Sequence, residues 1–220
     1  MQQGRLGLAE KAFLEAIKVD GSFLLAYSNL ATTYLAMDLL DKAEEICRVA
    51  ISKESNFIPA IHSLGVVLTR LNKNDSAEQV FKQVLDFDPY HSQAVLNLAS
   101  LYSVQGKIDS AKKLFEKAIK LDPSNSQAHV NIGNFYSELG QLGEAVIYLN
   151  KALELDPDNI EAYYILSTSG GVVLELDILN RLEMKLNSKS RIMPDQRIKI
   201  YFILAMQLER SGNASRSFYF

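Results

Sequence analysis

Residues 94–123 read AVLNLASLYSVQGKIDSAKKLFEKAIKLDP, and residues 128–157 read AHVNIGNFYSELGQLGEAVIYLNKALELDP. The two stretches repeat the same pattern of alanine, leucine or isoleucine, glycine and Asp-Pro at a distance of 34 residues. Two alanine series keep this spacing along the chain: Ala26, Ala60, Ala94, Ala128 and Ala162, and Ala9, Ala43, Ala77, Ala111 and Ala145. A fixed period of this length predicts stacked supersecondary units, none of which can bury its apolar face alone.

Each unit shows apolar residues at helical spacing twice, which predicts two amphipathic helices. Small residues on both helices are expected to let the helix axes approach closely. The positions between the two helices hold residue types that tolerate the left-handed backbone of a helix C-terminus, namely Gly4, Asp38, Asn72, Gly106 and Gly140. Between units, we expect each aspartate to cap a helix whose first turn holds the proline that follows, at Asp88-Pro89, Asp122-Pro123 and Asp156-Pro157.

The spacing of these residues resembles that of the tetratricopeptide repeat family. The copies are Tyr27-x2-Leu30-Ala31-x2-Tyr34 with Ala43-x3-Cys47, Ile61-x2-Leu64-Gly65-x2-Leu68 with Ala77-x3-Phe81, Val95-x2-Leu98-Ala99-x2-Tyr102 with Ala111-x3-Phe115, and His129-x2-Ile132-Gly133-x2-Tyr136 with Ala145-x3-Leu149. The resemblance implies an all-α fold, a right-handed superhelical solenoid of antiparallel helix pairs. Residues 1–157 would form the regular array, with a half repeat at 3–20 and four repeats from about 23 to 157.

Residues 158–220 break the pattern. The step from Leu166 to Leu204 is 38 residues, so an insertion of four residues falls in the fifth unit. Its second helix, near 174–186, has Leu179 in the alanine slot and is expected to pack further away or at another angle. A basic loop over 188–194 follows. A truncated last repeat follows, with Tyr201-x2-Leu204-Ala205-x2-Leu208, a turn at Gly212 and Ser217 in the alanine slot. The half-units at both ends favour a fragment of a longer protein, and the alternative is a complete chain that pairs its open ends in a homodimer.

The C-terminal part also resembles the tetratricopeptide region of some bacterial sulfotransferases. The matching features are Leu182-Glu183, Pro194-Asp195-Gln196-Arg197-Ile198, Leu204-Ala205 and Gly212 followed by Ser217-Phe218. This resemblance implies that the chain is the targeting or substrate-presenting arm of a larger transferase whose catalytic domain lies outside it.

The composition of the chain indicates which classes of partner and which compartment to expect. The chain has 23 basic and 26 acidic residues, a formal net charge of −3 and one cysteine. Without a basic stripe or a long apolar stretch, neither nucleic acid nor a membrane is an expected partner. Cys47 takes a bulky core slot and is expected to be buried. The absence of a disulfide framework and of an export signal predicts a cytoplasmic protein.

No catalytic or metal site is expected. The three histidines His62, His91 and His129 are scattered and lack ligand spacing, and His129 takes an aromatic slot where packing is its expected role. The glycine-containing stretch 167–171 lacks the lysine of a phosphate-binding loop and is interpreted as a helix end. The sequence therefore predicts no enzyme activity from these residues alone, and no cofactor.

A row of polar residues marks the expected binding surface. In helix-pair solenoids the first helices line the concave side. The first position of each motif is the aromatic slot, held here by Tyr27, Ile61, Val95 and His129. Two residues after it stand Asn29, Ser63, Asn97 and Asn131, with Asn134 and Tyr164 beside them. Amide groups can hold the backbone of an extended peptide, because each offers a donor and an acceptor. Alternatively, the asparagines bond the backbone of a neighbouring repeat and fix the stack, and both roles are compatible.

Family resemblance refines the expected partner. A similar row of asparagines lines the groove of O-linked N-acetylglucosamine transferases. Family members that bind the C-terminal tails of chaperones hold the terminal carboxylate with lysine, asparagine and arginine side chains. Here Ser28 and His62 stand in the lysine slot, and Asn97 and Asn131 stand in the arginine slot. We therefore expect a non-catalytic protein-interaction module that binds a neutral extended peptide or protein segment. The rivals are the transferase arm described above and self-association through uncapped ends.

Overall fold

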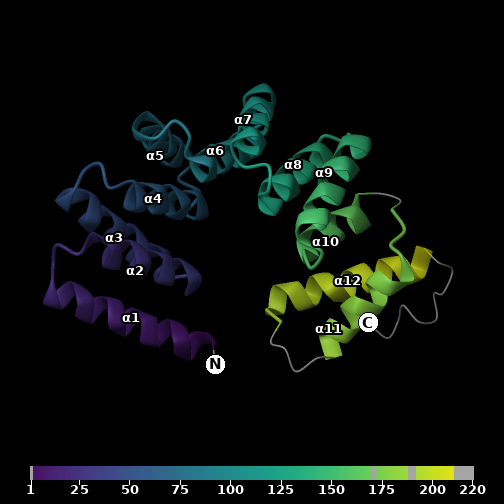
Figure 1. Ribbon diagram of the computed structural model, residues 1–220, viewed down its shortest axis with the longest axis horizontal. Coiled ribbons are helices and arrows are strands. Elements are labelled where there is room, and N and C mark those ends of the chain that lie inside the picture. Colours follow the sequence, from purple (N-terminus) through teal and green to yellow (C-terminus); the bar gives the residue numbers. More distant parts are fainter. Residues whose placement is uncertain (1, 170–171, 188–191, 211–220) are drawn as a thin grey trace. The chain divides into compact units, whose positions relative to one another are not determined.

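The computed structural model describes residues 2–169, 172–187 and 192–210 (Figure 1). Within these ranges every regular element is an α-helix, which confirms the all-α prediction. The helices are α1 (Gln2–Val19), α2 (Leu24–Ala36), α3 (Leu40–Lys53), α4 (Ile58–Arg70), α5 (Asn74–Phe87), α6 (Ser92–Val104), α7 (Ile108–Leu121), α8 (Ser126–Glu138), α9 (Leu142–Leu155), α10 (Ile160–Thr168), α11 (Leu176–Asn187) and α12 (Pro194–Arg210).

The chain divides into two compact units, Met1–Leu121 and Asp122–Phe220. In the first unit, α2 pairs with α3, α4 with α5 and α6 with α7, and α1 packs on α2. In the second unit, α8 pairs with α9, while α10 packs on α8, α9 and α12. The first helices of successive repeats contact one another, since α2 touches α4 and α4 touches α6. This neighbourhood places equivalent residues of successive repeats on one face.

Small residues on the first helices face large ones on the second. A Cβ added at Gly65 would lie 2.5 Å from Cε1 of Phe81, and one added at Gly133 would lie 2.7 Å from Cγ of Leu149. Phe81 and Leu149 are both buried. The two helices of these pairs are therefore as close as a missing side chain allows, which confirms the expected role of the small residues.

The turns inside the pairs adopt the predicted left-handed backbone. The φ angles are 60° at Asp38, 57° at Asn72, 70° at Gly106 and 71° at Gly140. The prediction is wrong at Gly4, because α1 runs through this residue as a continuous helix.

The Asp-Pro prediction is also wrong. Asp88 follows the last residue of α5, its carboxylate accepts from the amide of Tyr90 at 3.1 Å, and α6 begins only at Ser92. Pro89 therefore lies in the turn between two helices. The carboxylate stabilises that turn by bonding the amide two residues on, and the proline stops the helix from continuing. The caps come two residues after the proline, where the side chains of His91, Asn125 and Asn159 accept from the amides of Ala94, Ala128 and Ala162.

Polar atoms of the ring side chains in the aromatic slots bond to backbone carbonyls of the turns between repeats. Tyr27 donates from its hydroxyl to the carbonyl of Gly21 at 3.0 Å, and Tyr163 donates to that of Pro157 at 3.2 Å. Nε2 of His129 makes the equivalent bond to the carbonyl of Pro123 at 3.0 Å. His129 is buried, as predicted, and it also ties a turn to its helix.

Ion pairs join successive repeats on the second helices of the first unit. Glu44 pairs with Arg48 and with Lys73, and Glu78 pairs with Lys82 and with Lys107. The hydrogen bonds from Lys107 and Lys82 hold the pKa of Glu78 down to about 2. Each carboxylate thus contacts a cation of its own helix and one from the start of the next second helix.

The fifth unit departs from close pairing, as its sequence predicts. No Cα pair of α10 and α11 comes within 8 Å, whereas α11 and α10 both pack on α12. Leu179 is half-buried in the alanine slot and Leu182 is buried in the cluster with Tyr163. A leucine in place of alanine keeps the backbones apart, so side chains fill the gap.

Several predictions for this region concern residues outside the described ranges. They are the glycines at 170–171, most of the basic loop at 188–194, the turn at Gly212 and the alanine slot at Ser217. The helix before the glycines ends at Thr168, as expected of a helix end. Cys47 is buried, and desolvation raises the pKa of its thiol to about 12, so it belongs to the core.

Candidate binding face

The predicted row divides between the two units. In the first unit it consists of Asn29 on α2, Ser63 on α4 and Asn97 on α6. Asn29 is exposed, Ser63 is buried and Asn97 is half-buried. The side chain of Asn29 makes no hydrogen bond to any described residue. The row therefore offers one freely accessible amide and a second that is partly accessible.

Asn97 belongs to a network that joins two repeats. Its Nδ2 lies 3.0 Å from Nε2 of His62 on α4, and its Oδ1 accepts from Nε2 of Gln93 at 3.3 Å. The amide thus bonds a side chain of the neighbouring repeat. The sequence suggests a bond to the backbone of that repeat instead. One hydrogen of Nδ2 and one lone pair of Oδ1 remain for a ligand.

His62 is held in its neutral form at this junction. Its ring stacks on that of His91 with centroids 5.1 Å apart and lies 6.1 Å from that of Phe81. Desolvation by burial, and secondarily the nearby His91, lower the pKa of His62 to about 4. If Nε2 accepts from Asn97, the ring proton sits on Nδ1. The first unit therefore presents an uncharged imidazole beside the asparagine.

Arg70, at the end of α4, is tied to the end of the neighbouring first helix. Arg70 donates to the carbonyl of Leu35 and to Oδ1 of Asp38, both at 2.8 Å. These bonds hold the guanidinium at the C-terminus of α2, where a cation favours the helix dipole. The row itself is uncharged.

In the second unit the row continues on α8 and gives way to aromatic rings. Asn131 accepts from Nε2 of Gln127 at 2.7 Å, and Asn134 donates to Oε1 of Glu138 at 2.8 Å. Both asparagines are half-buried. Tyr164 on α10 contacts the ring of Phe202 on α12, with centroids 5.7 Å apart. Phe202 is not among the residues expected here, although counting the repeat register through the four-residue insertion puts it in the position of Tyr164.

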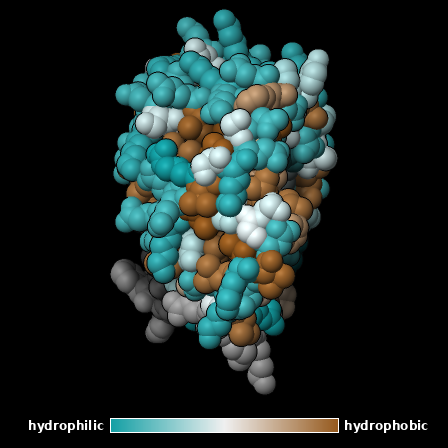
Figure 2. All heavy atoms as spheres, turned by 90° about the vertical axis from the view of Figure 1, so that its left-hand side faces the viewer, coloured by the Kyte–Doolittle hydropathy of each residue, from teal (hydrophilic) through white to brown (hydrophobic). Residues whose placement is uncertain are grey.

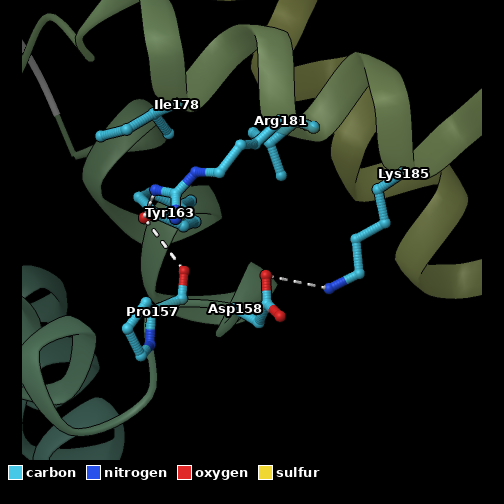
Figure 3. A pocket seen from close by; sticks show the side chains of 7 residues that line it. Pro157, Asp158, Tyr163, Ile178, Arg181 and Lys185 are labelled. Atoms are coloured by element: carbon cyan, nitrogen blue, oxygen red, sulfur yellow. Dashed lines mark hydrogen bonds and ion pairs between the residues drawn. The ribbon is translucent and has the colours of Figure 1, made fainter.

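A small pocket lies where α11 meets the turn before α10 (Figure 3). The hydroxyl of Tyr163 donates to the carbonyl of Pro157 and accepts from Nη2 of Arg181 at 3.3 Å. Nζ of Lys185 lies 3.4 Å from Oδ1 of Asp158. These contacts fasten α11, whose backbone stays away from α10, to the turn between repeats. We interpret the pocket as a structural joint.

Other kinds of site are not found in the part of the chain that the structure describes. There, no group of three potential metal ligands comes together, and no helix is long and apolar enough to cross a membrane. On the side of α1 to α5, apolar side chains reach the surface in a broken strip between polar ones (Figure 2). Nothing in the structure shows what covers this strip.

Comparison with known proteins identifies the repeat. Residues 68–114 and 104–168 match the model of the tetratricopeptide repeat family. Residues 68–168 therefore carry tetratricopeptide repeats. Before this segment α2 and α3 pair as the helices within it do, and the all-helical fold of the described chain matches solved tetratricopeptide structures.

Solved structures of tetratricopeptide proteins are similar to the chain. The thermophilic protein TTC0263 of Thermus thermophilus is 23% identical with a TM-score of 0.66, covering 73% of this chain and 88% of that protein. PilF of Pseudomonas aeruginosa is 17% identical with a TM-score of 0.65, covering 99% and 89%. YrrB, described as a tetratricopeptide protein with an unusual peptide-binding site, is 21% identical with a TM-score of 0.54, covering 73% and 83%.

These likenesses show the fold. No curated protein matches the sequence significantly. The sulfotransferase resemblance of the C-terminal part stays a prediction, because none of these comparisons bears on it.

Proposed function

We propose that the chain is a non-catalytic interaction module that binds an extended protein segment across the first helices of its repeats. The observation that carries the proposal is the exposed, unbonded amide of Asn29 in a row that also holds the partly accessible amide of Asn97. An amide side chain offers a donor and an acceptor, which suits the alternating amide and carbonyl groups of an extended backbone. A fold likeness to YrrB, whose description names a peptide-binding site, supports this use of the architecture.

The uncharged character of the face supports a neutral segment. Arg70 is held by Asp38, and His62 stays neutral at pH 7, so the first-unit row has no cation to attract a carboxylate. Recognition would then rest on backbone hydrogen bonds. Each is worth about 0.5–1.5 kcal/mol net, so a segment needs several of them to bind.

Selection from a random library tests the proposal. A library of twelve-residue peptides displayed on phage is selected against the immobilised full chain, and enriched peptides are synthesised and titrated by fluorescence anisotropy. We expect Asn29→Ala to weaken binding about threefold to tenfold, as the loss of one hydrogen bond predicts. Asn97→Ala should weaken peptide binding to a similar extent, and it also removes the hydrogen bond between Asn97 and His62.

The matched control is Asn150→Ala, an equivalent change at an exposed position of the second helix α9. It should leave the affinity unchanged, and circular dichroism should show equal helicity for all variants. If Asn97→Ala loses helicity, only the affinity of the Asn29→Ala variant is used to judge the proposal. Failure to enrich any peptide, or equal weakening by Asn150→Ala, would overturn the proposal.

Self-association through the ends of the array stays a prediction. On α1, Ala9 and Phe13 are half-buried, whereas the equivalent Ala43 and Cys47 on α3 are buried. Light scattering across a dilution series tests this prediction. A molar mass that stays at one chain over the series would contradict it.

A further inference from the structure

The first helices of the second unit carry an aromatic platform, formed by Tyr164 of α10 and Phe202 of α12. Their rings meet at 5.7 Å and 53°, a tilted arrangement that aromatic pairs favour. Phe202 keeps 46% of its surface exposed and Tyr164 is half-buried. One turn before Phe202, Ile198 is 68% exposed and extends the apolar surface along α12.

The opposite side of α12 accounts for the stability of this helix. Ile200, Ile203 and Leu204 are buried in the cluster that also contains Tyr163 and Leu182. Gln207 is buried too and accepts from the amide of Leu174 at 3.0 Å. The exposed ring of Phe202 is therefore not needed to anchor α12, and it remains available to a partner.

The charges that border the platform cancel one another. Lys199 of α12 forms an ion pair with Glu161 of α10, and its Nζ lies 5.6 Å from the centre of the Tyr164 ring. The ammonium already interacts with the aromatic ring and with the carboxylate, so a second cation would have to displace it. An anion would find no free positive charge in this pair. The side chain that complements the platform is thus uncharged and apolar.

Amide groups lie on the helix next to the platform. Asn131 and Asn134 are half-buried on α8, which packs on α10. Polar groups beside an apolar surface suit a chain that is held by its backbone and anchored by one side chain. We propose that the aromatic platform takes an aromatic or large aliphatic side chain of an extended segment bound on the first helices of the second unit. This inference rests on the proposed function and adds the partner's anchor residue to it.

Small model compounds test the platform without knowledge of the partner. Amide and methyl NMR spectra of the isotope-labelled full chain are recorded with N-acetyl-phenylalaninamide, N-acetyl-lysinamide and N-acetyl-aspartamide, each at millimolar concentration. We expect the phenylalanine compound to shift signals of α10 and α12 around Tyr164 and Phe202. Phe202→Ala should abolish these shifts, and Lys199→Met should retain them.

The matched control is Phe87→Ala at the end of α5, where the side chain is 49% exposed. This variant should leave the shifts of the second unit unchanged. Stronger shifts with the lysine compound, or shifts that survive Phe202→Ala in a folded variant, would overturn the inference.

The peptides selected for the proposed function separate the two failures. If peptides are selected but the phenylalanine compound shifts no signals of α10 and α12, the anchor is wrong and the proposed function stands. If no peptide is selected while the phenylalanine compound binds the platform, the proposed function fails and the apolar subsite stands.

Discussion

The close helix pairs of the regular repeats differ from the splayed pair of the fifth unit. In α4 and α5, Gly65 lies against the ring of Phe81, and in α8 and α9, Gly133 lies against Leu149. In α10 and α11, where Leu179 replaces alanine, the backbones stay apart and Tyr163, Arg181 and Leu182 fill the space. The pairs differ at one slot of the second helix, where Ala77 and Ala145 are buried in the close pairs and Leu179 stands in the fifth unit. The size of this residue goes with how closely a pair packs, while the 34-residue period decides which helices meet.

The first-helix faces differ in the same two regions. Where the pairs are close, the face carries Asn29, His62 and Asn97, and where the pair is splayed it carries Tyr164 and Phe202. His62, Tyr164 and Phe202 occupy equivalent positions of their repeats. One architecture therefore presents polar residues on the first helices of the regular repeats and an aromatic pair on α10 and α12.

Removing the large partner of a close pair should have the largest effect on stability. Phe81 is fully buried against Gly65, so Phe81→Ala leaves a cavity beside a residue that cannot fill it. We expect a loss of about 3–5 kcal/mol in the free energy of unfolding, measured with urea. Phe87→Ala, at an exposed position of the same helix, should cost less than about 0.5 kcal/mol. Equal losses for the two variants would contradict the account of close pairing.

Enlarging the small partner should cost less. In Gly65→Ala the new methyl group would lie 2.5 Å from the Phe81 ring, so helix α4 or the ring must shift. We expect a loss of about 1–3 kcal/mol, as for other overpacked cores. Gly143→Ala is the control, because an added Cβ meets nothing within 4 Å in α9, and it should stabilise the helix by about 0.5–1 kcal/mol. A stabilising Gly65→Ala would contradict the close approach.

Acid should affect the polar face through His62. The pKa of His62 is about 4 in the folded chain and near 6.5 when unfolded, so the unfolded state binds the proton first. The contribution of His62 to the free energy of unfolding should therefore be complete above pH 6.5 and should decrease as the pH drops toward 4. Between pH 7 and 5.5 we expect a loss on the order of 1 kcal/mol in urea titrations.

The control for this prediction is His62→Gln, which keeps an acceptor for Asn97 but cannot titrate. His91, whose ring stacks on that of His62, stays in place in both proteins. The variant should lose less stability over the same pH interval. The same loss in both proteins would show that other groups cause it.

The sequence predicts the architecture well because its period fixes which residues meet. The small-to-large pairing at Gly65, the left-handed turn at Asn72 and the distant packing of α11 all follow from position within the repeat. The caps were misassigned because Asp88 and His91 are both able to cap. The turn around Pro89, and not residue type, decides between them.

The candidate site is less predictable, since it depends on rotamers across helices. Spacing places Asn97 on the first-helix face, but it does not show that His62 and Gln93 take up part of its amide. Likewise, the burial of Ser63 follows from the packing of α4 between its neighbours. The position of Phe202 follows from the motif at Tyr201, but its contact with the ring of Tyr164 depends on how α10 and α12 pack.

Hydrogen–deuterium exchange of the full chain with a selected peptide tests the central claim most directly. Binding on the first-helix face should slow amide exchange in α2, α4 and α6, or in α8, α10 and α12, and leave α3, α5, α7 and α9 unchanged. Protection confined to the second helices would contradict the account, because the peptide would then bind the opposite side of the repeats.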